Sequence, residues 1–230
     1  DWSSDVCSSD LPSGAVPARN MTGVWDAGGA GIGGSGQAAE RAANTAPLTP
    51  FGEEMAKQNK PGNGPRSAPV AEINDPLSTI GDPSGFPRLL TFELRPFQVI
   101  QTPNQVVILY MFEKRYRVIW TDGRQLPKDP DPRWYGYSVG HWESDDTFVV
   151  NTVGLDDRTW IDNSGSPHST ELKVEERYHR VAGNMMELTV KIDDPKVYTK
   201  PWLARNKLPL RMMPGNVDLM EMIPSASEAQ

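Results

Sequence analysis

Short strand-like runs separated by tight turns are the feature that most restricts the fold of this chain. The clearest pair covers 171–181 and 185–193, on either side of Ala182-Gly183-Asn184. In the second run every other residue from Leu188 to Ile192 is apolar, which is typical of a strand with one buried face. Because only a few residues join such runs, they predict antiparallel hairpins.

Applied to the whole chain, this pattern predicts eight to ten strands and one short helix. Thr49, an N-cap residue, precedes Pro50 and two glutamates, so the helix is expected to begin there. A meander of this length removes its exposed edges by closing. We therefore expect an all-β fold, an antiparallel up-and-down barrel, with a two-sheet β-sandwich as the alternative. The expected strands cover 23–26, 97–101, 106–111, 116–121, 136–142, 147–153, 171–181 and 185–193, with edge strands over 197–203 and 217–223.

A single domain over 23–223 is expected, in which 27–94 forms an irregular wrap. Residues 1–22 are expected to be non-native or disordered, because the first eleven resemble a translated sequencing adaptor. Residues 224–230 are expected to be a disordered tail. The only cysteine is Cys7, so the chain cannot form an intrachain disulfide.

Charge and hydropathy exclude two classes of partner. The net charge of −7 argues against nucleic-acid binding, which needs a basic surface. No apolar run approaches the roughly 20 residues that a membrane-spanning helix requires. Composition leaves the oligomeric state open.

The stretch 133–169 is where a functional site is expected, since it holds three of the seven Trp and two of the three His. Aromatic rings cover apolar molecules, and arginines bind anionic groups. Those rings can equally fill the core, and the arginines can equally clip loops through Asp122, Asp131 and Asp157. The expected ligand-binding residues are Trp120, Arg124, Trp134, Tyr137, His141, Arg158, Trp160 and His168.

Catalysis is the competing interpretation of the same stretch. His141 and His168, with Asp157 or Glu143, offer general acid–base groups for a hydrolase-like reaction. The alternation in 136–142 places His141 outward if Trp142 fills the core. The histidines lack the spacings of zinc sites, so we expect no metal and no other cofactor. Whether the chain is an enzyme stays open at this point.

Several longer runs resemble a family of uncharacterised exported bacterial proteins. They include Ile119-Trp120-Thr121-Asp122-Gly123-Arg124, residues 129–142, Asp157-Arg158-Thr159-Trp160 and Pro167-His168-Ser169. This resemblance implies a periplasmic or secreted protein that is made with a leader peptide. A weaker resemblance, through Gly23-Val24-Trp25, is to lipocalin-like barrels.

These observations lead to an expected function. The leading hypothesis is an exported barrel that binds a small, partly apolar molecule inside its lumen. The alternatives are the hydrolase-like enzyme and an envelope interaction protein with a filled core, whose loops 124–135 and 155–169 bind another protein.

Overall fold

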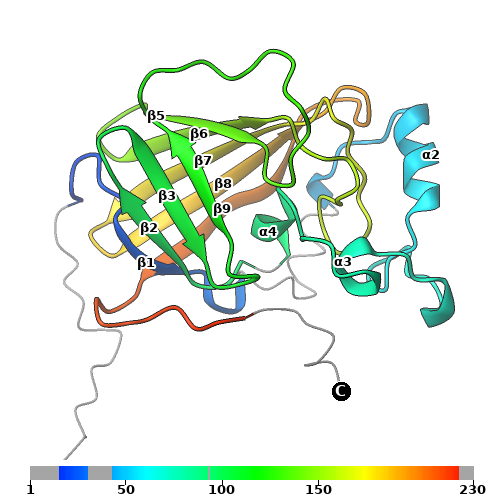
Figure 1. Ribbon diagram of the computed structural model, residues 1–230, viewed down its shortest axis with the longest axis horizontal. Coiled ribbons are helices and arrows are strands. Elements are labelled where there is room, and N and C mark those ends of the chain that lie inside the picture. The colour runs from blue at the N-terminus through cyan, green and yellow to red at the C-terminus, as the bar shows by residue number, and fades with distance from the viewer. Residues whose placement is uncertain (1–15, 31–42, 93, 223–230) are drawn as a thin grey trace, which may run out of the picture.

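A closed barrel of nine strands forms the body of the protein in the computed structural model, which describes residues 16–30, 43–92 and 94–222 (Figure 1). This confirms the expected all-β barrel. The strands are β1 (Gly23–Asp26), β2 (Phe97–Gln101), β3 (Gln105–Tyr110), β4 (Tyr116–Trp120), β5 (Tyr137–Trp142), β6 (Thr147–Val153), β7 (Lys173–Ala182), β8 (Met185–Asp193) and β9 (Trp202–Met212).

One pair of neighbouring strands departs from the expected antiparallel order. β4 and β5 run parallel and share two register pairs, Ile119 with Ser138 and Trp120 with Val139. The other neighbouring strands of the barrel pair antiparallel. Parallel strands need a long crossover connection instead of a tight turn. Residues 121–136 provide it, and this crossover loop arches over the outside of the barrel (Figure 1).

The last strand lies later in the chain than the sequence predicts. β9 pairs with β8 on one side and with β1 on the other, and so closes the barrel. It contains Pro209, which cannot donate a ladder hydrogen bond, and Lys207 at a positive φ of 52°. Neither of the edge strands expected over 197–203 and 217–223 forms as predicted. Among the described residues, the second contributes only an isolated bridge from Met222 to Phe112.

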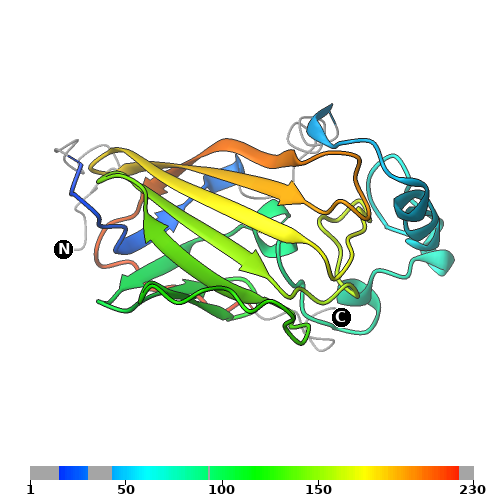
Figure 2. The same cartoon turned by 90° about the horizontal axis from the view of Figure 1, so that it is seen from above.

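α2, η2 and α3 lie together beyond one end of the barrel, whereas η1 directly follows β1 (Figures 1 and 2). α2 begins where the sequence predicts, with the Thr49 hydroxyl accepting a hydrogen bond from the Gly52 amide at 3.1 Å. The remaining helices lie in the wrap that was expected to be irregular. The helical segments are η1 (Gly28–Ala30), α2 (Pro50–Gln58), η2 (Val70–Glu72), α3 (Pro76–Thr79) and α4 (Arg88–Thr91).

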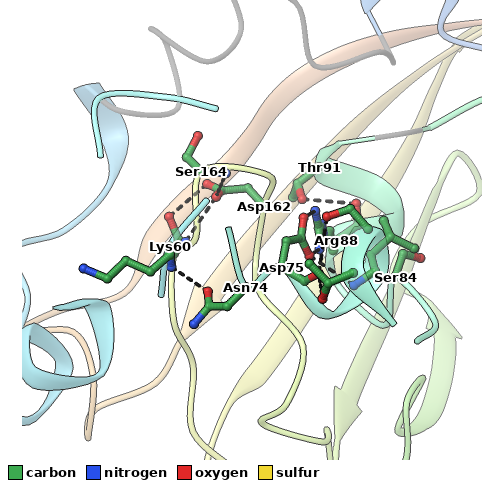
Figure 3. A network of polar contacts seen from close by, with 12 residues as sticks. Lys60, Asn74, Asp75, Ser84, Arg88, Thr91, Asp162 and Ser164 are labelled. Atoms are coloured by element: carbon green, nitrogen blue, oxygen red, sulfur yellow. Dashed lines mark hydrogen bonds and ion pairs between the residues drawn. The ribbon is translucent and has the colours of Figure 1, made fainter. Parts of the chain in front are cut away.

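α4 fills one end of the barrel interior, and we call it the α4 plug. All four of its residues are buried. Arg205 of β9 donates hydrogen bonds to the carbonyls of Leu90 and Thr91, at 3.1 and 2.8 Å. The Arg88 guanidinium forms two buried hydrogen bonds with the Asp75 carboxylate, at 2.7 and 2.6 Å (Figure 3). The plug is thus fixed by charged groups as well as by apolar packing.

A buried ion pair lies inside the barrel. Arg117 of β4 donates to both carboxylate oxygens of Glu176 of β7, at 3.1 and 2.8 Å, and both side chains are excluded from solvent. The guanidinium carbon lies 3.8 Å from the ring centroid of Phe86, just before α4. Burial is the largest single influence and disfavours the charged guanidinium, but the charge and hydrogen bonds of Glu176, together with Tyr110 and Tyr178, outweigh it and raise the pKa of Arg117. The described interior therefore has a polar centre in which the Glu176 carboxylate and both terminal nitrogens of Arg117 are hydrogen-bonded, while the Arg117 Nε has no partner.

The fold begins before Gly23. Met21 is fully buried, and its carbonyl accepts a hydrogen bond from the Trp25 indole at 2.9 Å. Arg180 donates to the carbonyl of Asn20 at 2.7 Å. Residues 1–15 and the expected tail 224–230 lie outside the described residues. No helix in the described part is long and apolar enough to cross a bilayer.

Candidate functional site

A pocket of about 530 Å³ lies where β4 and β5 meet beneath the crossover loop. Along β4, Arg117 and Ile119 are buried, while the residues between them are only partly covered or exposed. Alternation therefore turns Tyr116, Val118 and Trp120 to the outer face of the barrel. Tyr137 and Val139 of β5 line the same pocket. We call it the seam pocket; it lies on the outer wall and not in the lumen.

Two arginines stack on aromatic rings in the seam pocket. The Arg124 guanidinium carbon lies 3.6 Å from the Trp120 ring centroid, and that of Arg133 lies 4.0 Å from the Tyr137 ring centroid. Arg124 also hydrogen-bonds both carboxylate oxygens of Asp122, and this lowers the pKa of that carboxyl. Arg124 is thus held in place by its own neighbour.

Tyr135 supplies a further ring to the seam pocket. Its hydroxyl donates to the Glu113 carboxylate at 2.7 Å, and the other oxygen of that carboxylate accepts from the Ser84 amide at 2.7 Å. Burial and the neighbouring Glu113 charge both raise the pKa of Tyr135. Tyr135 is therefore a neutral phenol, and its hydroxyl is held by the Glu113 carboxylate.

The crossover loop is fixed at its end and free in its middle. The Arg133 amide donates to the Gly154 carbonyl at 2.9 Å. Gly154 has a φ of +70°, and a Cβ there would lie 2.7 Å from Pro130, so this glycine lets the loop approach the barrel. Within the described residues, 125–132 form no hydrogen bond and no ion pair. Three prolines keep this span stiff.

Three of the eight predicted ligand-binding residues meet in the seam pocket: Trp120, Arg124 and Tyr137. Two other predicted residues stack on each other outside it, since the Arg158 guanidinium lies 4.4 Å from the Trp134 ring centroid. Arg158 also pairs with Asp156 at 2.6 Å and not with Asp157. The hydrogen bonds from Arg158 lower the pKa of Asp156.

Trp160 is a core residue. It is 4% exposed, and the Arg88 guanidinium carbon lies 5.5 Å from its ring centroid. It therefore belongs to the surroundings of the α4 plug and not to the seam pocket.

The two histidines lie in different environments. His141 is exposed on β5, while Trp142 packs against Phe148 at a centroid distance of 5.2 Å, so His141 takes the outward orientation. His168 is fully buried, with Nε2 2.8 Å from the Thr159 hydroxyl and Nδ1 donating to the Ser169 carbonyl at 3.1 Å. Burial lowers the pKa of His168. Both of its ring nitrogens are thus engaged inside its own loop.

The predicted carboxylates do not join a histidine in a hydrogen bond. Glu143 pairs with Arg177, whose hydrogen bond lowers the pKa of that carboxyl, and Asp157 is exposed. Among the described residues, His179 is the histidine with carboxylates within 4 Å, 3.7 Å from Asp146 and 3.8 Å from Glu187. No group of three or more His, Cys, Asp or Glu in the described part of the chain is arranged to hold a metal ion.

A second pocket, of about 580 Å³, lies on the other side of the crossover loop, and Pro127 lines both pockets. Its charged lining residues carry both signs: Lys128, Asp129, Asp131, Glu171 and Lys173.

Arg133 and Tyr135 were absent from the predicted ligand-binding set, although both line the seam pocket. The set did include Trp134, which lies between them. In a strand, alternation would identify the neighbours that share a face, but these residues precede β5 in an irregular segment.

Comparisons of the chain with family models, curated proteins and solved structures gave no match.

Proposed function

We propose that this protein binds a small, partly apolar molecule in the seam pocket. The observation that carries the proposal is the meeting of four aromatic rings in one pocket, from β4, the crossover loop and β5: Tyr116, Trp120, Tyr135 and Tyr137. A volume of about 530 Å³ lies within the range of roughly 300–1,000 Å³ typical of small-molecule sites. Periplasmic or secreted location is part of the proposal on the resemblance alone.

The outer wall is a better location for this function than the lumen that we first expected. The polar centre of the barrel already has its own hydrogen-bond partners, and Phe86 covers the Arg117 guanidinium. The seam pocket instead combines rings with a crossover-loop span that no hydrogen bond or ion pair holds within the described residues. Because its prolines keep it stiff, this span can shift as a unit to admit a ligand without breaking a hydrogen bond or an ion pair of its own.

The hydrolase-like alternative is not proposed, because His168 is enclosed and His141 lies on the outer face without a carboxylate hydrogen-bonded to it. The interaction-protein alternative lacks a supporting feature as well. Exposed large apolar side chains in the described part come from separate elements, for example Val70 of η2 and Ile80 after α3.

A fluorescence titration with N-phenyl-1-naphthylamine, a neutral apolar dye, tests the proposal. Val139 lines the seam pocket, so Val139→Trp is expected to fill it and to weaken dye binding at least tenfold. Val181 is an exposed valine on β7, and Val181→Trp is the matched control that should leave binding unchanged. Absence of dye binding, or equal binding by both variants, would refute the seam pocket as the site.

A further inference from the structure

We propose that the ligand of the seam pocket is an organic anion, and that Arg133 binds its carboxylate or sulfonate group. This inference rests on the proposed function and adds the chemical class of the ligand. Arg133 differs from the other arginines around the crossover loop in having no carboxylate partner among the described residues.

Those neighbouring arginines are already paired. Arg117 is bound to Glu176, Arg124 to Asp122 and Arg158 to Asp156, at 2.8, 2.7 and 2.6 Å. Arg133 is exposed, and no carboxylate of the described residues lies within ion-pair distance of it. It is therefore the lining arginine whose charge is not compensated.

The stacking of Arg133 on Tyr137 holds the guanidinium without using its hydrogen-bond donors. The guanidinium carbon lies 4.0 Å from the ring centroid, and no N–H donor of the Arg133 side chain is used in a hydrogen bond within the described residues. A carboxylate or sulfonate accepts two such donors at once. The backbone is positioned as well, because the Arg133 amide is bonded to the Gly154 carbonyl and its carbonyl accepts from the Asp156 amide.

The lining of the seam pocket favours a negative ligand. It contains no Asp or Glu, and Arg133 is the lining residue whose positive charge is uncompensated, since Arg117 faces Glu176 inside the barrel and Arg124 is paired with Asp122. The chain as a whole carries a net charge of −7. The nearby acidic residues of the crossover loop, Asp129 and Asp131, line the second pocket instead. A positive pocket in an acidic protein selects anions by attraction within and by repulsion elsewhere.

The apolar part of the ligand is expected to be flat. Trp120 and Tyr137 each have a guanidinium over the ring, and the Tyr135 hydroxyl is held by Glu113. Rings fixed in this way offer stacking surfaces with little freedom to rearrange. An aromatic acid fits both features, with its ring against the tyrosines and its acidic group at Arg133.

The test compares two dyes that share one ring system: neutral N-phenyl-1-naphthylamine and its anionic sulfonate analogue, 8-anilino-1-naphthalenesulfonate. Arg133→Gln is expected to weaken binding of the sulfonate about tenfold, the loss typical of a charge-assisted hydrogen bond, and to leave the neutral dye unchanged. Arg133→Lys should retain part of the affinity. Arg211→Gln, at an exposed position on β9, is the charge-matched control and should change neither dye.

The outcomes separate the two proposals. If both dyes bind and Val139→Trp blocks both, but Arg133→Gln affects neither, the anion inference is overturned and the proposed function stands. If Val139→Trp fails to affect either dye, the proposed function itself is refuted. A sulfonate affinity that falls with added salt in the wild type, and does so less in Arg133→Gln, supports the inference.

Discussion

Replacing Arg117 with methionine is expected to destabilise the barrel strongly. The guanidinium and the Glu176 carboxylate are 2% and 0% exposed and share two hydrogen bonds. Methionine preserves most of the apolar volume but leaves the carboxylate buried without its cation. The Tyr178 hydroxyl, at 2.7 Å, would remain as a donor to it. The Ser138 and Thr152 hydroxyls, which are 2.9 Å apart, would still bond each other.

The size of the effect follows from the burial of the pair. Removing one partner of a fully buried ion pair typically costs about 3–5 kcal/mol, because the remaining charge has neither water nor counter-ion. For a chain of this length, each kcal/mol lowers Tm by about 2–4 °C. The expected fall in Tm for Arg117→Met is therefore about 6–20 °C.

A double variant separates the lost charge partner from lost packing. In Arg117→Met/Glu176→Leu both charges are gone, so the protein is expected to be more stable than with Arg117→Met alone. Some cost remains, because the Tyr178 hydroxyl loses its acceptor. If the buried carboxylate is the cause, the second substitution must recover stability instead of adding a further loss.

Equilibrium unfolding in urea, followed by tryptophan fluorescence and far-UV circular dichroism, measures these differences. Arg177→Met is the control, since Arg177 pairs with Glu143 at the surface and its loss should change the midpoint little. A free energy of unfolding for Arg117→Met within about 1 kcal/mol of the wild type would refute the reasoning. So would a double variant that is less stable than the single one.

Three further variants test other parts of the structure by the same unfolding assay. Gly154→Ala should lower the free energy of unfolding by about 2–3 kcal/mol, because Gly154 has a left-handed φ and an added Cβ would clash with the crossover loop. Gly123 also has a left-handed φ but open space around it, so Gly123→Ala should cost about 1 kcal/mol. Equal costs for the two variants would contradict the clash. Burial lowers the pKa of His168 below its value of about 6.5 in the unfolded chain. The unfolded state therefore takes up the proton first, and stability should fall as pH falls below about 6.5. His168→Gln should remove this component of the urea midpoint's pH dependence, and exposed His141→Gln should not. Arg205→Met should cost about 2–3 kcal/mol, because the final carbonyls of α4 lose a charged donor; an unchanged midpoint would show that the plug does not depend on it.

Local signals made most of the barrel predictable. The bounds of β1, β2, β6 and β8 and the start of α2 agree with the predicted ones, because these elements have a strand-like run or a cap and lie next to turn residues. β9 was missed because Pro209 and the positive φ of Lys207 interrupt its pattern. A strand that is irregular within itself is identified by its partners on both sides, and one of these, β1, lies at the other end of the described chain.

The polar centre of the barrel could have been found by the same alternation. A period of two places Arg117 with Ile119 and Glu176 with Val174, on the buried faces of β4 and β7. A charged side chain on the inward face of a strand is unfavourable by itself, so a prediction from sequence assigns it to the solvent-exposed face. It becomes acceptable only beside its opposite, and the sequence gives no sign that these two residues, 59 positions apart, face each other.

The site depended on strand order in the same way. Trp120 and Tyr137 lie in one pocket because β4 pairs with β5 in parallel. The length of the connection over 121–136 was the available signal, since a hairpin needs only a few residues. The predicted histidines and carboxylates were close in sequence, but His168 turns into the interior of its own loop while His141 stays on the strand's outer face.

The parallel pairing of β4 with β5 also explains why a pocket forms on the outer wall of the barrel. A hairpin between β4 and β5 would need only a few residues, whereas parallel strands oblige the chain to travel back along the barrel before β5 begins. With the α4 plug and the ion pair of Arg117 occupying the described interior, that return path lies outside. It covers part of the outer face of β4 and β5, where Pro127 lines the seam pocket while Pro130 packs closely against Gly154. The parallel pairing of β4 with β5 therefore produces a covered cavity, which is lined by the outward side chains of these two strands.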